Sequence, residues 1–287
     1  MKKKSGSKIS IGSANFGLNY TIDKIKLKKE EVFKILDLAK NNNINSIDTA
    51  QSYGKSENTI GEYIKLNCYK KFEITTKITI KKSKIDKILN DSQKKLSIMP
   101  RNVLVHNSED YLNDKFRADL IELKKRKEIM IGVSIYDDGE ILKVLKKHTP
   151  DIIQLPLNAI NKQSHSSGLL RLLKEQKVII QARSVFFQGL FFKEESIIKR
   201  KSIPLYKSLL KLKQIAINNN LTLPELSLIF VNSISEINKI VIGINSANEL
   251  KDNINIVKKI ASKKLINEIM DIDFKKINFT KIIQNLN

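Results

Sequence analysis

The chain has 287 residues, of which 41% are hydrophobic and 29% charged, proportions typical of a globular protein and not of a disordered or fibrous one. No apolar run approaches the roughly 20 residues of a membrane-spanning helix, so we expect no membrane partner. Cys68 is the only cysteine, which excludes an intrachain disulfide, and we expect no metal site.

The net charge of +22 would favour a protein that binds nucleic acid. Only six of the 52 basic residues are Arg, however, and base readout and bidentate phosphate recognition favour the arginine fork. We therefore expect a solvated lysine-rich surface and no nucleic acid partner. A basic protein that binds RNA or another anionic polymer is kept as the least favoured alternative. The stretch from Ile9 to Ile11 is too short for the apolar region of a secretory signal, so we expect a cytoplasmic protein.

Short β-branched runs alternate with longer amphipathic stretches along nearly the whole chain, which is typical of parallel strands joined by helices. The predicted strands are Ile9–Ala14, Ser46–Asp48, Phe72–Lys77, Asn102–His106, Met130–Ser134, Ile152–Gln154, Val178–Gln181 and Lys239–Ile242. The predicted helices are Glu30–Lys40, Ser56–Lys65, Ser83–Leu96, Leu112–Lys127, Asp138–Lys147, Ser167–Glu175, Leu205–Asn218, Pro224–Ser233 and Asn248–Ile260. Two consecutive helices before the last strand indicate an insertion.

This alternation, with no linker to divide it, predicts an α/β fold: a (β/α)8 TIM barrel, formed as one domain over residues 1–287. Residues 262–287 are expected to pack near the barrel as a C-terminal segment. A doubly wound open sheet is the alternative, but it normally carries G-x-G-x-x-G after an early strand, and that motif is absent. The stretches Gly12–Gly17 and Gly54–Ser56 each match only part of a phosphate-binding P-loop, which argues against a nucleoside triphosphatase.

Four polar residues stand where the chemistry of a barrel enzyme is expected, at or just after the carboxyl ends of strands. Asp48, Lys77 and His106 end predicted strands, and Tyr53 lies in the loop after Asp48. Each has an ordinary structural explanation as a turn, surface or core residue. Together they form a proton-transfer set, because a phenol with an ordinary pKa of about 10 needs a nearby cation to act as an acid at neutral pH.

The sequence around these residues resembles the aldo-keto reductase family. Ser46-Ile47-Asp48-Thr49-Ala50 followed by Tyr53-Gly54-Lys55-Ser56-Glu57 is similar to the family's signature around its catalytic aspartate and tyrosine, and Thr75-Thr76-Lys77 and Val105-His106 are similar to its lysine and histidine strands. The resemblance covers about residues 9–260. It implies that Tyr53 protonates a carbonyl oxygen as hydride arrives from a nicotinamide, that Asp48 holds Lys77 beside Tyr53, and that His106 orients the carbonyl.

The resemblance also implies a cofactor site on the other strands. Ser134 and Gln154 would lie near the nicotinamide amide, and Arg183 and Ser184 beside the ring and pyrophosphate. The run from Arg183 to Leu190, which includes Gln188 and Gly189, resembles a bacterial branch with an RSVFxQG motif. The final strand and loop would bind the adenosine end through Gly243, Ser246, Glu249 and Asn253.

Three positions depart from the common family pattern. Ile135 stands where many members have asparagine, and Arg183 where many have a tyrosine that stacks on the nicotinamide. Glu249 stands where an arginine or glutamine often receives the 2′-phosphate, and a carboxylate there would favour ribose hydroxyls over a phosphate. The alternative is that Glu249 is a solvated residue at the start of a helix. The cofactor is thus expected to be NADP(H) or NAD(H), with the preference open.

The expected function is an oxidoreductase that transfers hydride between a nicotinamide cofactor and a small-molecule carbonyl or alcohol substrate, with a sugar or sugar-derived intermediate as a candidate. The alternative is a cofactor-binding redox sensor or regulatory subunit without turnover. Substrate choice is expected to depend on the mouth loops and on residues 262–287, where Phe274 and Phe279 are candidates for pocket walls or for packing residues.

Overall fold

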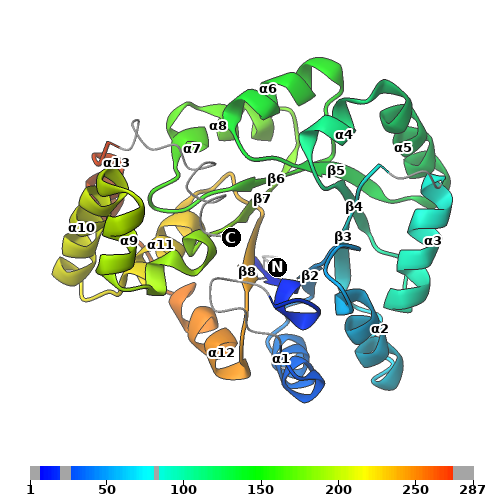
Figure 1. Ribbon diagram of the computed structural model, residues 1–287, viewed down its shortest axis with the longest axis horizontal. Coiled ribbons are helices and arrows are strands. Elements are labelled where there is room, and N and C mark those ends of the chain that lie inside the picture. The colour runs from blue at the N-terminus through cyan, green and yellow to red at the C-terminus, as the bar shows by residue number, and fades with distance from the viewer. Residues whose placement is uncertain (1–6, 20–26, 81–83, 274–287) are drawn as a thin grey trace, which may run out of the picture.

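A computed structural model describes residues 7–19, 27–80 and 84–273, and within them eight parallel strands close into one barrel in chain order (Figure 1). Each strand pairs with its neighbour in sequence, and β1 pairs with β8 to complete the barrel. The strands are β1 (Ile9–Gly12), β2 (Ser46–Asp48), β3 (Glu73–Ile78), β4 (Asn102–Val105), β5 (Met130–Ser134), β6 (Ile152–Pro156), β7 (Ile179–Arg183) and β8 (Lys239–Gly243). The predicted TIM barrel is confirmed.

Helices surround the barrel and cover the outer faces of its strands (Figure 1). They are α1 (Lys29–Asn41), α2 (Ser56–Leu66), α3 (Ile85–Leu96), α4 (Ser108–Leu112), α5 (Asp114–Lys127), α6 (Asp138–Lys147), α7 (Gln163–Ser166), α8 (Leu169–Glu175), α9 (Glu195–Lys201), α10 (Ile203–Asn218), α11 (Leu223–Ser233), α12 (Ala247–Ile256) and α13 (Lys263–Met270), with 3-10 turns η1 (Ala14–Phe16) and η2 (Phe187–Phe192). None of the helices in the described part of the chain is long and apolar enough to cross a membrane.

Local signals explain where several helices begin. Thr222 caps α11 in a capping box with Glu225, and Pro224 lies in the first turn, where its missing N–H is not needed. The helix predicted over Leu112–Lys127 is observed as α5, which begins at Asp114 because the Asn113 side chain accepts a hydrogen bond from the N–H of Phe116. The short helix α4, which was not predicted, precedes it.

Other differences from the predicted elements also have a local cause. The helix predicted over Ser167–Glu175 is observed as α8, which begins only after Gly168 because that residue has a φ of +80°. The short helix α7, which was not predicted, precedes it. The insertion before β8 is confirmed, with α9 as a third helix beside the two that were predicted. Of the C-terminal segment 262–287, α13 packs against α10, whereas Phe274 and Phe279 lie outside the described residues. Ser83, the predicted start of the third helix, also lies outside them.

Candidate active site

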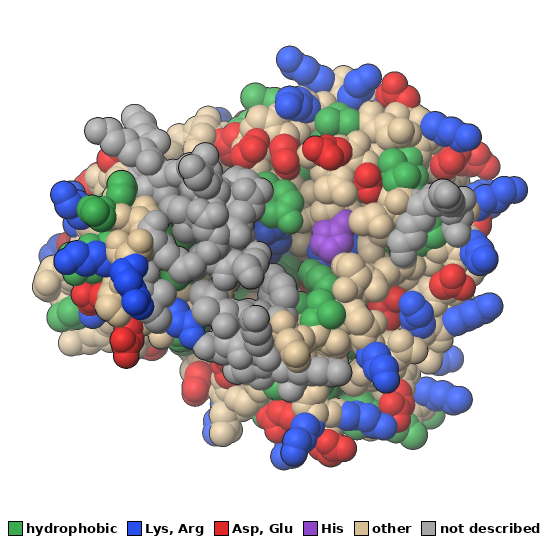
Figure 2. Space-filling view, viewed as in Figure 1, with side chains coloured by type: hydrophobic (Ala, Val, Ile, Leu, Met, Phe, Trp, Pro, Cys, Tyr) green, Lys and Arg blue, Asp and Glu red, His purple; other side chains and the backbone are tan. Residues whose placement is uncertain are grey.

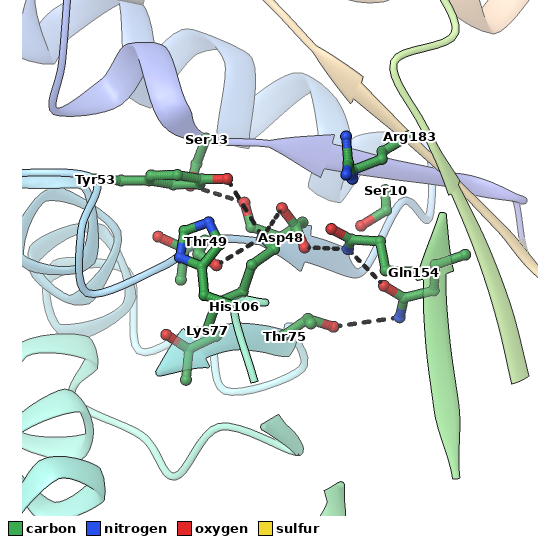
Figure 3. Close-up of polar contacts among 12 residues, drawn as sticks. Ser10, Ser13, Asp48, Thr49, Tyr53, Thr75, Lys77, His106, Gln154 and Arg183 are labelled. Atoms are coloured by element: carbon green, nitrogen blue, oxygen red, sulfur yellow. Dashed lines mark hydrogen bonds and ion pairs between the residues drawn. The ribbon is translucent and has the colours of Figure 1, made fainter. Parts of the chain in front are cut away.

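The carboxyl ends of the barrel strands bring the four predicted catalytic residues together. Asp48 is the last residue of β2, Lys77 is the penultimate residue of β3, and His106 directly follows β4. Tyr53 lies in the loop between β2 and α2, and its hydroxyl points toward the other three (Figure 3). The space-filling view shows a hollow on this face, with histidine and basic atoms visible inside it (Figure 2).

A buried ion pair forms the centre of the site. Lys77 Nζ lies 2.5 Å from Asp48 Oδ2, and both side chains are almost fully buried. Lys77 Nζ also donates to the backbone oxygen of Thr49 at 3.1 Å and lies 3.5 Å from the hydroxyl of Tyr53. Burial alone would lower the pKa of Lys77, but Asp48 and Tyr53 together hold it above its usual value. A permanent cation therefore lies beside the phenol.

Close backbone packing holds the Tyr53 loop in place. A Cβ on Gly17 would lie 2.0 Å from the Tyr53 carbonyl oxygen, so only glycine allows these two backbone segments to touch. A chain of buried hydroxyls joins the same loop to the barrel, because Ser56 Oγ donates to Ser13 Oγ at 2.8 Å and Ser13 Oγ donates to the Asp48 carbonyl oxygen at 2.8 Å. Contacts with the segment after β1 and with the end of β2 thus hold the Tyr53 loop in position.

His106 lies beside Tyr53 as a neutral imidazole. Its Nδ1 is 3.3 Å from Ser52 Oγ, and its ring meets that of Tyr53 edge to face, with 6.1 Å between centroids. Burial, followed by the positive charge of Lys77, lowers the pKa of His106 to about 4. An uncharged imidazole at neutral pH can donate one N–H to a substrate oxygen without adding a second cation to the site.

This shifted titration predicts a loss of stability in acid. Between about pH 6.5 and pH 4 the unfolded chain binds a proton at His106 and the folded chain does not, so the free energy of unfolding falls as the pH falls. His106→Asn removes that contribution. Denaturant unfolding at about pH 7 and pH 5 should therefore show a decline smaller by about 1 to 2 kcal/mol in the variant than in the parent chain. Equal declines would contradict the low pKa. Burial also lowers the pKa values of His148 and His165, which both chains retain.

Gln154 links the ion pair to the cofactor side predicted for the barrel. Its Nε2 donates to Asp48 Oδ1 at 2.7 Å and to Gln181 Oε1 at 3.0 Å, whereas its buried Oε1 has no hydrogen-bond partner among the described residues. Ser134 ends β5, pairs in register with Gln154 and is also buried. These residues present an unsatisfied acceptor and a hydroxyl at the same level of the barrel.

The loop after β7 carries the next predicted cofactor residues in a strained backbone. Arg183 ends β7 and Ser184 follows it with a φ of +58°, a left-handed conformation that is uncommon for residues other than glycine. Asn158 Nδ2 donates to the Ser184 carbonyl oxygen at 3.0 Å and holds this turn. Gln188 and Gly189 lie in η2, also with positive φ.

The four predicted adenosine-side residues lie apart from the tetrad. Gly243 ends β8, Ser246 is the N-cap of α12, and Asn253 is buried further along that helix. Ser246 Oγ accepts from the N–H of Glu249, and Glu249 Oε2 accepts from the N–H of Asn245 at 2.8 Å. Burial raises the pKa of Glu249. Ser246 and Glu249 thus shape the start of α12, and no hydrogen bond among the described residues links them to Asp48 or Tyr53.

Several contacts of the site were not predicted from the sequence. Ser52 contacts His106, Gln181 contacts Gln154, and the ring of Tyr136 lies under Arg183, with 4.6 Å from Cζ to the ring centroid. The only available signal was for Gln181, a polar residue at the end of a predicted strand and thus at the same level as the predicted site. The other two are loop residues whose partners are distant in the sequence.

The family model described as the aldo/keto reductase family matches residues 8–273. The chain belongs to the aldo/keto reductase family. This membership confirms the predicted resemblance and makes the protein an oxidoreductase by class. A search of curated proteins gives no match.

Solved aldo-keto reductases have the same fold as this one. A holo form from Bacillus halodurans matches with a TM-score of 0.76 at 18% identity, covering 95% of this chain and 94% of that one. A thermostable aldo-keto reductase in complex with the inhibitor epalrestat matches with a TM-score of 0.69 at 20% identity, covering 93% of this chain and 95% of that one. A structure from Pseudomonas aeruginosa matches with a TM-score of 0.63 at 18% identity, covering 89% of this chain and 93% of that one. At these identities the likeness concerns the fold alone.

Proposed function

We propose that this aldo/keto reductase interconverts a carbonyl compound and an alcohol with NAD(P)(H), using Tyr53 as the proton donor. One observation carries the proposal: the Tyr53 hydroxyl lies 3.5 Å from Lys77 Nζ, which is itself paired with Asp48 at 2.5 Å in a buried site. A cation fixed beside the phenol stabilises the phenolate that remains once the proton has passed to the substrate oxygen.

The proposed reduction needs two donors at the substrate oxygen. Tyr53 transfers its proton to that oxygen as negative charge develops there, and Lys77 stabilises the resulting phenolate. The neutral His106 donates an N–H to the same oxygen and orients the carbonyl. Asp48 keeps Lys77 in place, and Gln154 in turn binds the second oxygen of Asp48. In the alcohol-oxidising direction the proton passes from the substrate hydroxyl to the Tyr53 phenolate.

The residues on the cofactor side fit a nicotinamide. The buried, unpartnered Oε1 of Gln154 can accept a hydrogen bond from the carboxamide, and Ser134 can bind the same group. Arg183, Ser184, Gln188 and Gly189 would face the ring and pyrophosphate from the strained loop. The reduced nicotinamide supplies hydride to the carbonyl carbon when it is bound.

Two carboxylates at the start of α12 bear on the choice between NAD(H) and NADP(H). Glu249 Oε2 accepts from the N–H of Asn245, and Glu31 Oε1 accepts from the N–H of Ala247 at 2.9 Å. If the adenosine end lies here, as we propose with Gly243, Ser246 and Asn253 beside it, these groups occupy donors that a 2′-phosphate would need and add like charge. We therefore propose a preference for NAD(H).

The proposed function is tested by cofactor binding and by turnover. We expect purified protein to change the fluorescence of NADH on binding, with a weaker effect for NADPH, and to consume NADH in the presence of aldehydes or sugars. The measurement is a panel of carbonyl compounds, sugars included, followed by nicotinamide absorbance with both cofactors. Binding without turnover on the whole panel would instead favour a redox sensor, and absence of binding would contradict the proposal altogether.

A further inference from the structure

A line of polar side chains crosses the interior of the barrel, where branched apolar residues are usual. It runs from the carboxyl end of β2 to the first residues of β3 and β4, and each member forms a hydrogen bond with the next. All of its members except the last are at most 3% exposed. In order they are Asp48, Gln154, Gln181, Thr75, Asn102 and Glu73.

The first bonds of this line fix the orientation of the Gln154 amide. Its Nε2 uses both of its N–H groups, one on Asp48 Oδ1 at 2.7 Å and the other on Gln181 Oε1 at 3.0 Å (Figure 3). Turning the amide over would place its oxygen against the Asp48 carboxylate, where two acceptors would face each other. Two bonds from one nitrogen also set the plane of the amide, so the direction of the buried, unpartnered Oε1 is fixed.

The remaining bonds fix Gln181 in the same way from the other end of the line. Gln181 Nε2 donates to Thr75 Oγ1 over 3.5 Å, so its Oε1 is the atom that faces Gln154. Thr75 Oγ1 also accepts from Asn102 Nδ2 at 3.0 Å, and that nitrogen donates to the Glu73 carboxylate at 3.2 Å. Without Gln181 the Gln154 amide would be held by Asp48 alone and could turn about that one bond.

We propose that Gln181 is a positioning residue for the cofactor, which holds the Gln154 amide in the one orientation that leaves its Oε1 free to accept from a carboxamide N–H. The inference rests on the proposed function and adds to it a residue that would not itself contact the nicotinamide. A buried acceptor without a partner is costly, so the site should select cofactors that bring the N–H it lacks.

The test measures cofactor affinity by isothermal titration calorimetry and needs no turnover. The ligands are NAD⁺ and its acetylpyridine analogue, in which a methyl group replaces the carboxamide nitrogen and removes the N–H. For the parent chain we expect NAD⁺ to bind about tenfold or more tightly than the analogue, which leaves Gln154 Oε1 without a donor. Gln181→Met keeps the length of the side chain and removes its acceptor. It should bring the two Kd values within about threefold of each other by weakening NAD⁺ alone.

Two further variants separate positioning from a general loss of stability. In Gln181→Glu at about pH 6 the buried carboxyl stays protonated, accepts from Gln154 and donates to Thr75, so the ratio of the two Kd values should stay near that of the parent. Asn232→Leu is the matched control. It removes a half-buried amide of α11 that donates to the Val257 carbonyl oxygen at 2.9 Å, so it should lower stability without changing the ratio.

Every outcome decides. If both Kd values rise in parallel in Gln181→Met, Gln181 only supports the barrel and the inference is wrong. Equal binding of the two ligands by the parent chain overturns it too, while the reductase activity stands. If Gln181→Met does not fold, Thr75→Val replaces it, because it removes the acceptor of Gln181 Nε2 and should lower the ratio at least about twofold. An unchanged ratio there is again contrary. If the parent chain binds no nicotinamide dinucleotide and shows no turnover, the proposed function fails, and the inference with it.

Discussion

Lys77→Met is expected to destabilise the fold by about 3 to 5 kcal/mol and to reduce turnover by about a hundredfold or more. The loss of stability follows because the variant leaves the Asp48 carboxylate buried without its cation, and within the described part of the chain only Gln154 Nε2 still donates to it. The loss of turnover follows because no cation remains beside the Tyr53 hydroxyl. Denaturant unfolding and a kcat measurement on the folded variant report the two effects separately.

A double variant distinguishes the two roles of Lys77. Adding Asp48→Asn to Lys77→Met removes the unpaired buried charge, so stability should be partly regained while turnover stays low. Lys29→Met is the matched control, because Lys29 forms an exposed ion pair with Glu62 and its loss should change stability by about 1 kcal/mol or less. A stable, fully active Lys77→Met would contradict the assignment of Lys77 as the cation of the site.

The grouping of the four candidate catalytic residues was predictable because they stand at or just after strand ends, which a parallel barrel brings to one mouth. Strand positions were readable from short β-branched runs bounded by turns, and the predicted strands overlap all those observed. The order Asp48, Tyr53, Lys77 and His106 therefore translated directly into proximity. Their proposed roles come from the family resemblance.

Contacts between loops were not predictable in the same way. The pairing of Ser52 with His106 joins residues 54 positions apart, and the stacking of Arg183 on Tyr136 joins the last residue of β7 to the loop after β5. Neither pair leaves a periodic trace in the sequence, since loop side chains follow no period of 2 or 3.6.

Gly17 illustrates a further limit. The sequence showed it only as part of an incomplete P-loop match, whereas its actual role is to let the backbone of one loop touch that of the Tyr53 loop. Such a requirement arises from the distance between two segments that approach only after the barrel closes. For the same reason the hydroxyl chain from Ser56 through Ser13 to Asp48 could not be read from any local motif.

Tyr53→Phe is expected to lower kcat by about 10² to 10⁴, the range that general acid catalysis supplies, while NADH binding stays close to that of the parent chain. The variant removes one hydroxyl and keeps the ring, so the edge-to-face contact with His106 and the position of Lys77 over the ring are preserved. The measurement pairs single-turnover kinetics with NADH fluorescence, which separates the chemical step from cofactor binding.

Tyr69→Phe supplies the matched control for that variant. Tyr69 donates its hydroxyl to Asn45 Oδ1 at 2.7 Å away from the tetrad, so its loss should cost about 1 kcal/mol of stability and no turnover. If Tyr53→Phe kept its turnover, another group would have to protonate the carbonyl oxygen, and His106, neutral and beside the phenol, would be the first to examine. If instead Tyr53→Phe and Lys77→Met lost turnover to the same extent and the double variant lost no more, the two residues would be acting as one unit, as their 3.5 Å separation requires.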